Sequence, residues 1–129
     1  MKQIKIAAAA AVILVLWATA IAQTAAFRFN GPLSRVLTPN SDGRNDVAIF
    51  CFDNFSDSDV EGKIFSLLGA EVARLELRRL PTAGCPLGNL PQHMIWNARS
   101  NGSIVSSGIY VYQIKAEGLS FTGSLVVVR

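Results

Sequence analysis

The stretch that decides the fold runs from residue 108 to residue 128 and reads GIYVYQIKAEGLSFTGSLVVV. Its first half alternates between two faces with a period of two, as a β-strand does. One face carries Ile109, Val111, Gln113 and Lys115, and the other carries Tyr110, Tyr112, Ile114 and Ala116. Gly118 then opens a tight turn into a second strand-like stretch at residues 120–128. The pattern predicts a β-hairpin.

Similar alternation recurs upstream, and helical periodicity is hard to find after residue 22. We expect further short strands at residues 33–38, 47–52, 60–67, 71–80 and 94–96. The dipeptide Asn101-Gly102 is a strong hairpin signal, and the stretch 82–91 has the Pro and Gly content of a loop. About seven short strands separated by turns predict an all-β fold, an immunoglobulin-like antiparallel β-sandwich.

The first 22 residues have the parts of a cleavable secretory signal peptide in order. Lys2 and Lys5 give a positively charged n-region, and residues 6–17 form an apolar run. Ala20-Ile21-Ala22 is a small-x-small triplet that suits cleavage by signal peptidase. An uncleaved membrane anchor is the alternative, although the apolar stretch lies at the short end of what crosses a bilayer. We therefore expect a signal peptide at 1–22, a flexible lead-in at 23–31 and one sandwich domain at 32–129. The mature protein would be secreted, on the cell surface or in the periplasm, without stable membrane insertion.

The charge of the chain gives little sign of a nucleic-acid partner. The full sequence has 12 basic and 9 acidic residues, and removing Lys2 and Lys5 leaves 10 against 9, a net charge of +1. Three arginines lie close together at positions 74, 78 and 79, but leucines alternate with them. A solvated strand face explains them better than a phosphate-binding patch.

The chain has two cysteines, Cys51 and Cys85. In an oxidising compartment a pair is more often bonded than free, so we expect a Cys51–Cys85 disulfide. Two free, buried cysteines are the alternative.

Four motifs in order carry a resemblance to a known family. They read LTPNSDGRND at 37–46, IFSLLGAEV at 64–72, WN at 96–97 followed by NG at 101–102 and SGIYVY at 107–112, and FTGSLVVVR at 121–129. Together they resemble the gliding motility-associated C-terminal domain, the type B sorting domain of the bacterial type IX secretion system. Ser41 stands where that family usually has glycine, and Asn97-Ala98 stands where it has aspartate-glycine. The later motifs are also similar to the Ig-like domain of the flagellar hook-capping protein.

We expect a non-enzymatic domain that acts through its surface, and the resemblance implies that its partners belong to an outer-membrane secretion or surface-attachment apparatus. The recognition elements would be the loop 39–46 and the C-terminal hairpin 110–129, with Tyr110, Tyr112 and Arg129 on the recognition surface. One alternative is a structural or adhesive subunit that adds an open edge strand to a partner's sheet. Another is a module that assembles with flagellar parts.

The loop 40–46 is the most chemically suggestive segment. Asn40, Asp42 and Asp46 have the N-x-D-G-x-x-D spacing of part of a calcium loop. These side chains and a backbone carbonyl give only about half of the 6–8 oxygens that calcium needs. The alternative is a turn in which Asn and Asp side chains accept hydrogen bonds from nearby backbone amides. No other cofactor is expected.

The remaining polar residues give little support for catalysis. The acidic residues Asp53, Asp57, Asp59 and Glu61 fit a solvated loop better than a cation site. His93 is the only histidine, and we expect it at a strand edge rather than in a metal cluster or catalytic triad. Trp96 is expected in the core, as is usual for a tryptophan on a sandwich strand.

Overall fold

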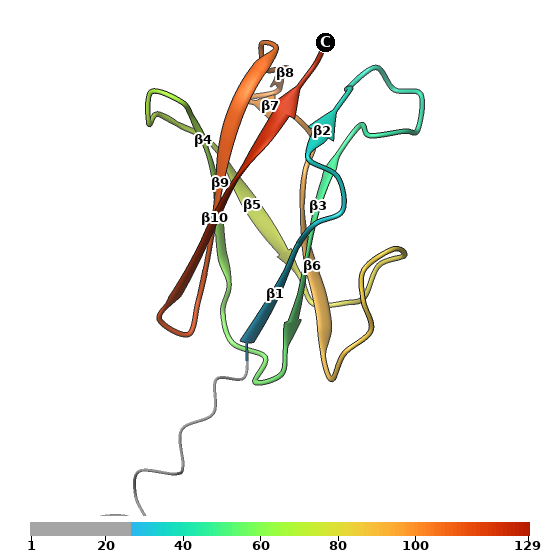
Figure 1. The fold of residues 1–129 in the computed structure, drawn as a ribbon, viewed down its shortest axis with the longest axis vertical. Helices are drawn as coiled ribbons and strands as arrows, with labels where there is room; N and C mark the ends of the chain where they lie inside the picture. Colours follow the sequence, from blue (N-terminus) through green and yellow to red (C-terminus); the bar gives the residue numbers. More distant parts are fainter. Residues whose placement is uncertain (1–26) are drawn as a thin grey trace, which may run out of the picture.

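The structure, a computed structural model, describes residues 27–129 (Figure 1). The predicted signal peptide at 1–22 and residues 23–26 of the predicted lead-in lie outside this part of the chain. All regular elements in the described part are β-strands. They are β1 (Phe27–Pro32), β2 (Val36–Leu37), β3 (Ala48–Asn54), β4 (Glu61–Ser66), β5 (Glu71–Arg78), β6 (Pro91–Trp96), β7 (Arg99–Ser100), β8 (Ser103–Ile104), β9 (Gly108–Ala116) and β10 (Leu119–Val127).

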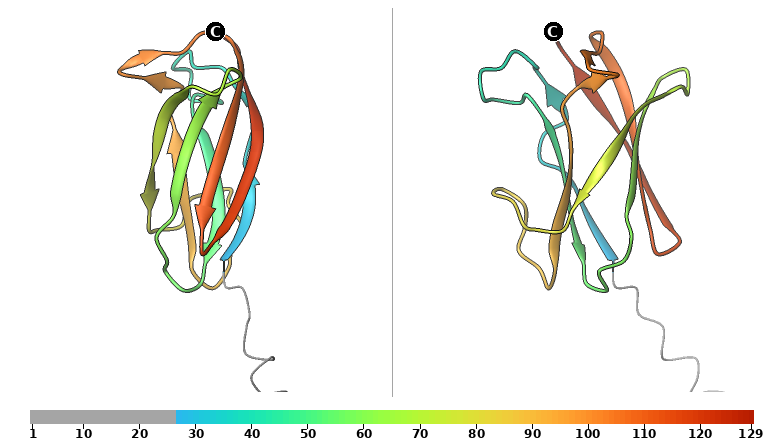
Figure 2. Two further views of the ribbon diagram at one scale, coloured as in Figure 1. Left: turned by 90° about the vertical axis from the view of Figure 1, so that its left-hand side faces the viewer. Right: turned by 180° about the vertical axis from the view of Figure 1, so that it is seen from behind.

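The strands form two layers that share β5. The hydrogen-bonded order is β1-β3-β6-β5-β4-β9-β10-β2, and β7 pairs with β8 separately. The first part of β5 pairs with β4, whereas Glu76, Leu77 and Arg78 pair with β6, so β5 passes from one layer to the other. Figure 2 shows β4, β9 and β10 face on in its left view. The layers β1-β3-β6-β5 and β4-β9-β10 have the strand order of the immunoglobulin sandwich, and the predicted fold class is confirmed.

The core lies between the layers and receives every second residue of the facing strands. Its fully buried side chains include Phe50, Ile64, Met94 and Leu125. The layers approach closely at Gly62, where an added Cβ would lie 2.6 Å from the Met94 sulfur. Trp96 is 2% exposed, which confirms its predicted place in the core.

The predicted strands agree with the structure best at the C-terminal hairpin. Strand β9 spans the predicted residues, and its face with Tyr110, Tyr112, Ile114 and Ala116 is the buried one. The strand predicted at 33–38 is reduced to Val36–Leu37. The dipeptide Asn101-Gly102 forms the turn between β7 and β8, with φ of 51° and 86°.

The N-terminal segment differs from the sequence-based expectation. Residues 27–31 were expected within a flexible lead-in, but they belong to β1, which pairs with β3. Phe27 and Phe29 explain the difference, because their rings lie 5.7 and 5.2 Å from the ring of Phe121 on β10. This aromatic packing holds the strand against the opposite layer.

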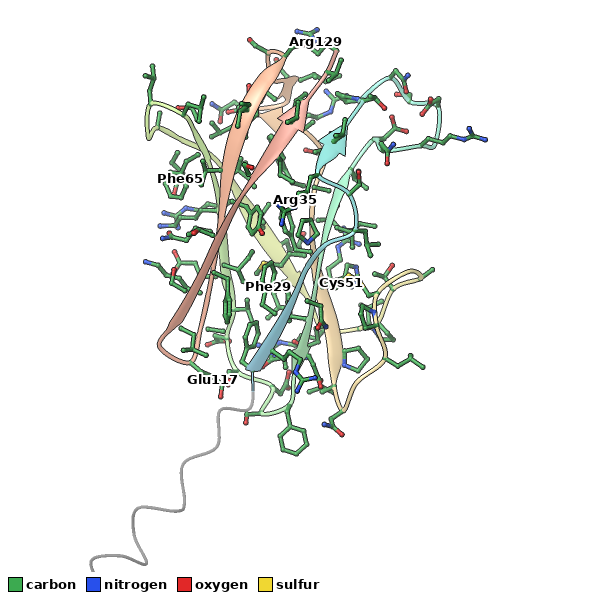
Figure 3. The ribbon with its side chains drawn as sticks, viewed as in Figure 1. Phe29, Arg35, Cys51, Phe65, Glu117 and Arg129 are labelled. Atoms are coloured by element: carbon green, nitrogen blue, oxygen red, sulfur yellow. A yellow bond between two sulfur atoms is a disulfide. The ribbon has the colours of Figure 1, made fainter. Side chains whose placement is uncertain are left out.

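The predicted disulfide is present. Cys51 is buried on β3, and its bond to Cys85 ties that strand to the loop between β5 and β6 (Figure 3). Asp53 secures the same loop by accepting hydrogen bonds from the backbone amides of Asn89 at 3.1 Å and Leu90 at 2.7 Å.

Within residues 27–129 we find no helix that is long and apolar enough to cross a membrane.

Candidate recognition surface

Three segments that are distant in the sequence meet at one end of the sandwich. They are the loop 38–47, the β7–β8 hairpin and the C-terminus, all at the top of Figure 1. The amide of Val128 donates to the carbonyl of Leu37 at 2.8 Å, and the amide of Arg129 donates to Ser107 Oγ at 2.9 Å. A cleft of about 150 Å³ lies between the loop and the hairpin, and its lining includes Ser41, Asp46 and Arg99. We call this end the C-terminal surface.

Asp46 organises the loop 38–47. Its Oδ1 accepts hydrogen bonds from the amides of Asn40 and Ser41 at 3.1 and 2.9 Å, and its Oδ2 accepts one from Gly43 at 2.7 Å. Asp42 Oδ1 accepts from the amide of Arg44 at 2.8 Å. The side chains therefore hold the loop in one shape by accepting hydrogen bonds from backbone amides, as in Asx turns.

Removing the Asp46 carboxylate is expected to destabilise the fold, because three backbone donors lose their acceptor. We expect Asp46→Ala to lower the free energy of unfolding by about 1–2 kcal/mol, since exposed amides regain water in part. Asp42→Ala is the matched control, because Asp42 accepts only one such hydrogen bond in the structure. Urea denaturation measures both, and an equal loss in the two variants would contradict the assigned role of Asp46.

Two residues in the loops at this end, Ser41 and Ala98, have a left-handed backbone although neither is a glycine. The φ angle of Ser41 is 62°, and that of Ala98 is 58°. Glycine adopts this region without the steric cost that a Cβ brings. A glycine at either position would avoid this steric cost.

Replacing Ser41 by glycine is expected to stabilise the protein. Glycine relieves the strain of the left-handed backbone but also raises the conformational entropy of the unfolded chain, which is destabilising. We expect the first effect to be larger, so that the free energy of unfolding rises by about 0.5–1 kcal/mol. Ser106→Gly serves as the control at an exposed serine without a positive φ. A melting temperature that falls for Ser41→Gly would be the contrary result.

The loop's suitability for calcium stays a prediction. Asn40, Asp42 and Asp46 lie together in the loop, but each has a side-chain oxygen that accepts a hydrogen bond from a backbone amide. No group of three or more His, Cys, Asp or Glu side chains within residues 27–129 is arranged to hold a metal ion. Calorimetric titration with calcium tests the prediction, and heat that disappears in Asp46→Ala would support it.

The β7–β8 hairpin is fixed to the core by its neighbours. Trp96 Nε1 donates to the carbonyl of Arg99 at 3.0 Å, and Ser100 Oγ donates to the carbonyl of Val72 at 2.8 Å. The Arg99 guanidinium donates to the carbonyl of Gly102 at 2.9 Å. The Asn101-Gly102 pair predicted the turn, but no pattern in the sequence marked Arg99 or Ser107 as part of this surface.

The prediction that Tyr110 and Tyr112 lie on a recognition surface is wrong. Their exposed fractions are 8% and 3%, because both project from β9 into the core. The ring of Tyr110 packs 5.5 Å from Trp96, and its hydroxyl donates to the carbonyl of Ser106 at 2.7 Å. This contact resembles the tyrosine corner of immunoglobulin-type sandwiches. Arg129, by contrast, is exposed at the C-terminal surface (Figure 3).

The acidic stretch lies at the opposite end of the sandwich. Arg79 forms ion pairs with Asp57 and, at 3.0 Å, with Asp59. The hydrogen bond from Gln92, followed by that from Arg79, lowers the pKa of Asp57. A hydrogen bond from Lys63 lowers the pKa of the Glu61 carboxyl in the same way. These carboxylates pair with basic or amide groups of the same domain.

His93 is buried in an interior strand, not at the strand edge that we expected. Strand β6 lies between β3 and β5, and His93 is 3% exposed. Its Nδ1 lies 2.8 Å from the carbonyl oxygen of Leu80. The sequence alone does not place Leu80 beside His93, because the contact follows from the pairing of β5 with β6.

In comparisons with known protein families, curated proteins and solved structures, no family model, curated protein or solved structure matches this chain.

Proposed function

We propose that this chain is an exported, non-enzymatic immunoglobulin-like domain that acts in type IX secretion sorting or in cell-surface attachment. The observation that carries the proposal is the meeting of the first and last family motifs at one end. Residue 37 begins the first motif and Val128 lies in the last, and their backbones are hydrogen-bonded at 2.8 Å. Two segments separated by about 90 residues in the chain thus form one surface that a partner protein can bind.

The disulfide supports export. Such bonds persist in oxidising compartments and are rare where thiols are kept reduced. Cys51–Cys85 fits a protein that leaves the cytoplasm, in agreement with the signal-like residues 1–22.

The polar groups support recognition rather than catalysis. A general base must reach the proton that it removes, and His93 is buried against a backbone carbonyl. The hydrogen bonds of Asp42 and Asp46 go to the loop's own amides. These groups shape a surface.

A reporter fusion tests the proposal. Residues 27–129 are placed behind a folded, exported reporter in a bacterium with a type IX system, so that β1 is kept whole. We expect protease-accessible reporter on the cell surface. An isogenic strain without the type IX translocon is the control and should retain the reporter in the periplasm. Periplasmic retention in both strains would reject the sorting role.

A further inference from the structure

Each of the two layers has an edge strand, and the two edge strands differ in how well they are protected against pairing with another chain. Strand β1 is the edge of one layer, and β10 is the edge of the other below the short strand β2 (Figure 1). Only Val126 and Val127 of β10 pair with β2, which leaves residues 119–125 without a strand on that side within the described chain. A free strand edge is a template for pairing with another chain.

The hydrogen bonds to β2 show which backbone groups of β10 face the free edge. The amide of Val126 donates to the carbonyl of Arg35 at 2.7 Å, so even-numbered residues point their N–H and C=O groups toward this edge. The same alternation directs the backbone groups of Ser120, Thr122 and Ser124 outward. Their side chains are exposed as well.

Strand β1 has features that prevent another strand from pairing with its edge, whereas β10 has none. Exposed Arg28, an irregularity in pairing between Phe29 and Gly31, and Pro32 all disfavour the addition of a strand to β1. From Leu119 to Val128 the chain has no charged residue and no proline. Edge strands of proteins that remain monomeric usually carry such protection.

We propose that two copies of this chain associate through their β10 edges, paired antiparallel about a two-fold axis at Thr122. This inference does not depend on a sorting role. The segment Ser120-Phe121-Thr122-Gly123-Ser124 is self-complementary in this register. Thr122 lies opposite Thr122 of the second copy, and each Ser120 lies opposite a Ser124. Each half-buried Phe121 lies opposite a glycine, so two large side chains do not compete for one space.

Charge at the two ends of the paired segment is also complementary. Arg35 lies beside Val126 at the upper end of the free edge, and Glu117 lies in the turn at the lower end (Figure 3). In the antiparallel pair, the turn with Glu117 of each copy comes to the end of the edge that carries Arg35 of the other. Opposite charges at both ends favour this register over a shifted one.

Sedimentation of the full chain, expressed with export and purified in its oxidised form, tests the proposal. A contact of about seven residues per copy is small, so we expect a weak, concentration-dependent dimer. Thr122→Lys places two like charges opposite each other and should raise the dissociation constant by about tenfold or more. Asn30→Lys adds the same charge on the β1 edge and should leave the dimer unchanged.

A cysteine variant tests the register independently of stability. Residues paired directly through their backbone groups have Cα atoms about 5.5 Å apart, which is within disulfide reach. Thr122→Cys should therefore form a disulfide-linked dimer on mild oxidation, and Gln113→Cys, one strand inward, should not. Peptide mapping confirms that Cys51–Cys85 stays intact. A chain that stays monomeric at about 1 mM overturns the proposal. So does a dimer that survives Thr122→Lys but is lost in Ile109→Lys on the exposed sheet face.

Discussion

Loss of the Cys51–Cys85 disulfide is expected to lower the free energy of unfolding by about 3–4 kcal/mol. The bond closes a loop between residues that are 34 positions apart and thereby restricts the unfolded chain. Because a small domain is stabilised by only about 5–15 kcal/mol, this is a large fraction of its stability. We expect the double variant Cys51→Ala/Cys85→Ala to fold but to unfold at a much lower urea concentration.

Treatment with a reductant distinguishes the effect of breaking the disulfide from the effect of replacing the two cysteine side chains. The wild-type protein treated with dithiothreitol should approach the stability of the double variant, and the variant should not respond to dithiothreitol. If the oxidised protein and the variant unfolded at the same urea concentration, the bond would have no stabilising role. A Cys85→Ala single variant, which leaves buried Cys51 in place, serves as the matched control for core packing.

Replacing Gly123 by alanine is expected to cost about 1–3 kcal/mol, because the added methyl group meets a ring that has no room to move. An added Cβ would lie within 2.5 Å of two ring carbons of Tyr112. That ring is packed between Phe29 at 5.8 Å and Phe50 at 5.0 Å. The family-like pairing of a Y-x-Y strand with a T-G-x strand thus has a packing explanation.

A double-mutant cycle tests this explanation. Tyr112→Leu shortens the opposing side chain, so Gly123→Ala should cost less in the Tyr112→Leu background than in the wild-type protein. Gly102→Ala is not a suitable control, because its φ of 86° adds strain. Ser124→Ala, at an exposed position on the same strand, should be nearly neutral. Additive effects of the changes at 112 and 123 would contradict the proposed clash.

Much of the fold was predictable because burial follows a period of two in the main strands. Strand β9 alternates clearly, so its bounds and its two faces were predicted correctly. Which face is buried was not predictable, because a tyrosine suits both a core and a surface. The structure resolves this point for Tyr112 through its contacts with β1 and β3.

The elements that depend on distant partners have no local signal in the sequence. Strand β1 has only two inward aromatic residues and an interrupting Gly31, and its order comes from packing against Phe121. The C-terminal surface likewise depends on the pairing of β2 with β10, which brings residues 37 and 128 together. Local pattern cannot reveal a contact across so much of the chain.

A secretion or attachment partner is proposed to recognise the C-terminal surface. The most direct test measures the surface fraction of the reporter fused to residues 27–129 when exposed basic side chains are removed at either end. We expect Arg44→Ala/Arg129→Ala, on the C-terminal surface, to leave the reporter in the periplasm. We expect Arg28→Ala/Lys115→Ala, a matched loss of charge at the opposite end, to leave export to the surface intact. Equal surface fractions for the two variants, with both domains folded, would contradict the claim.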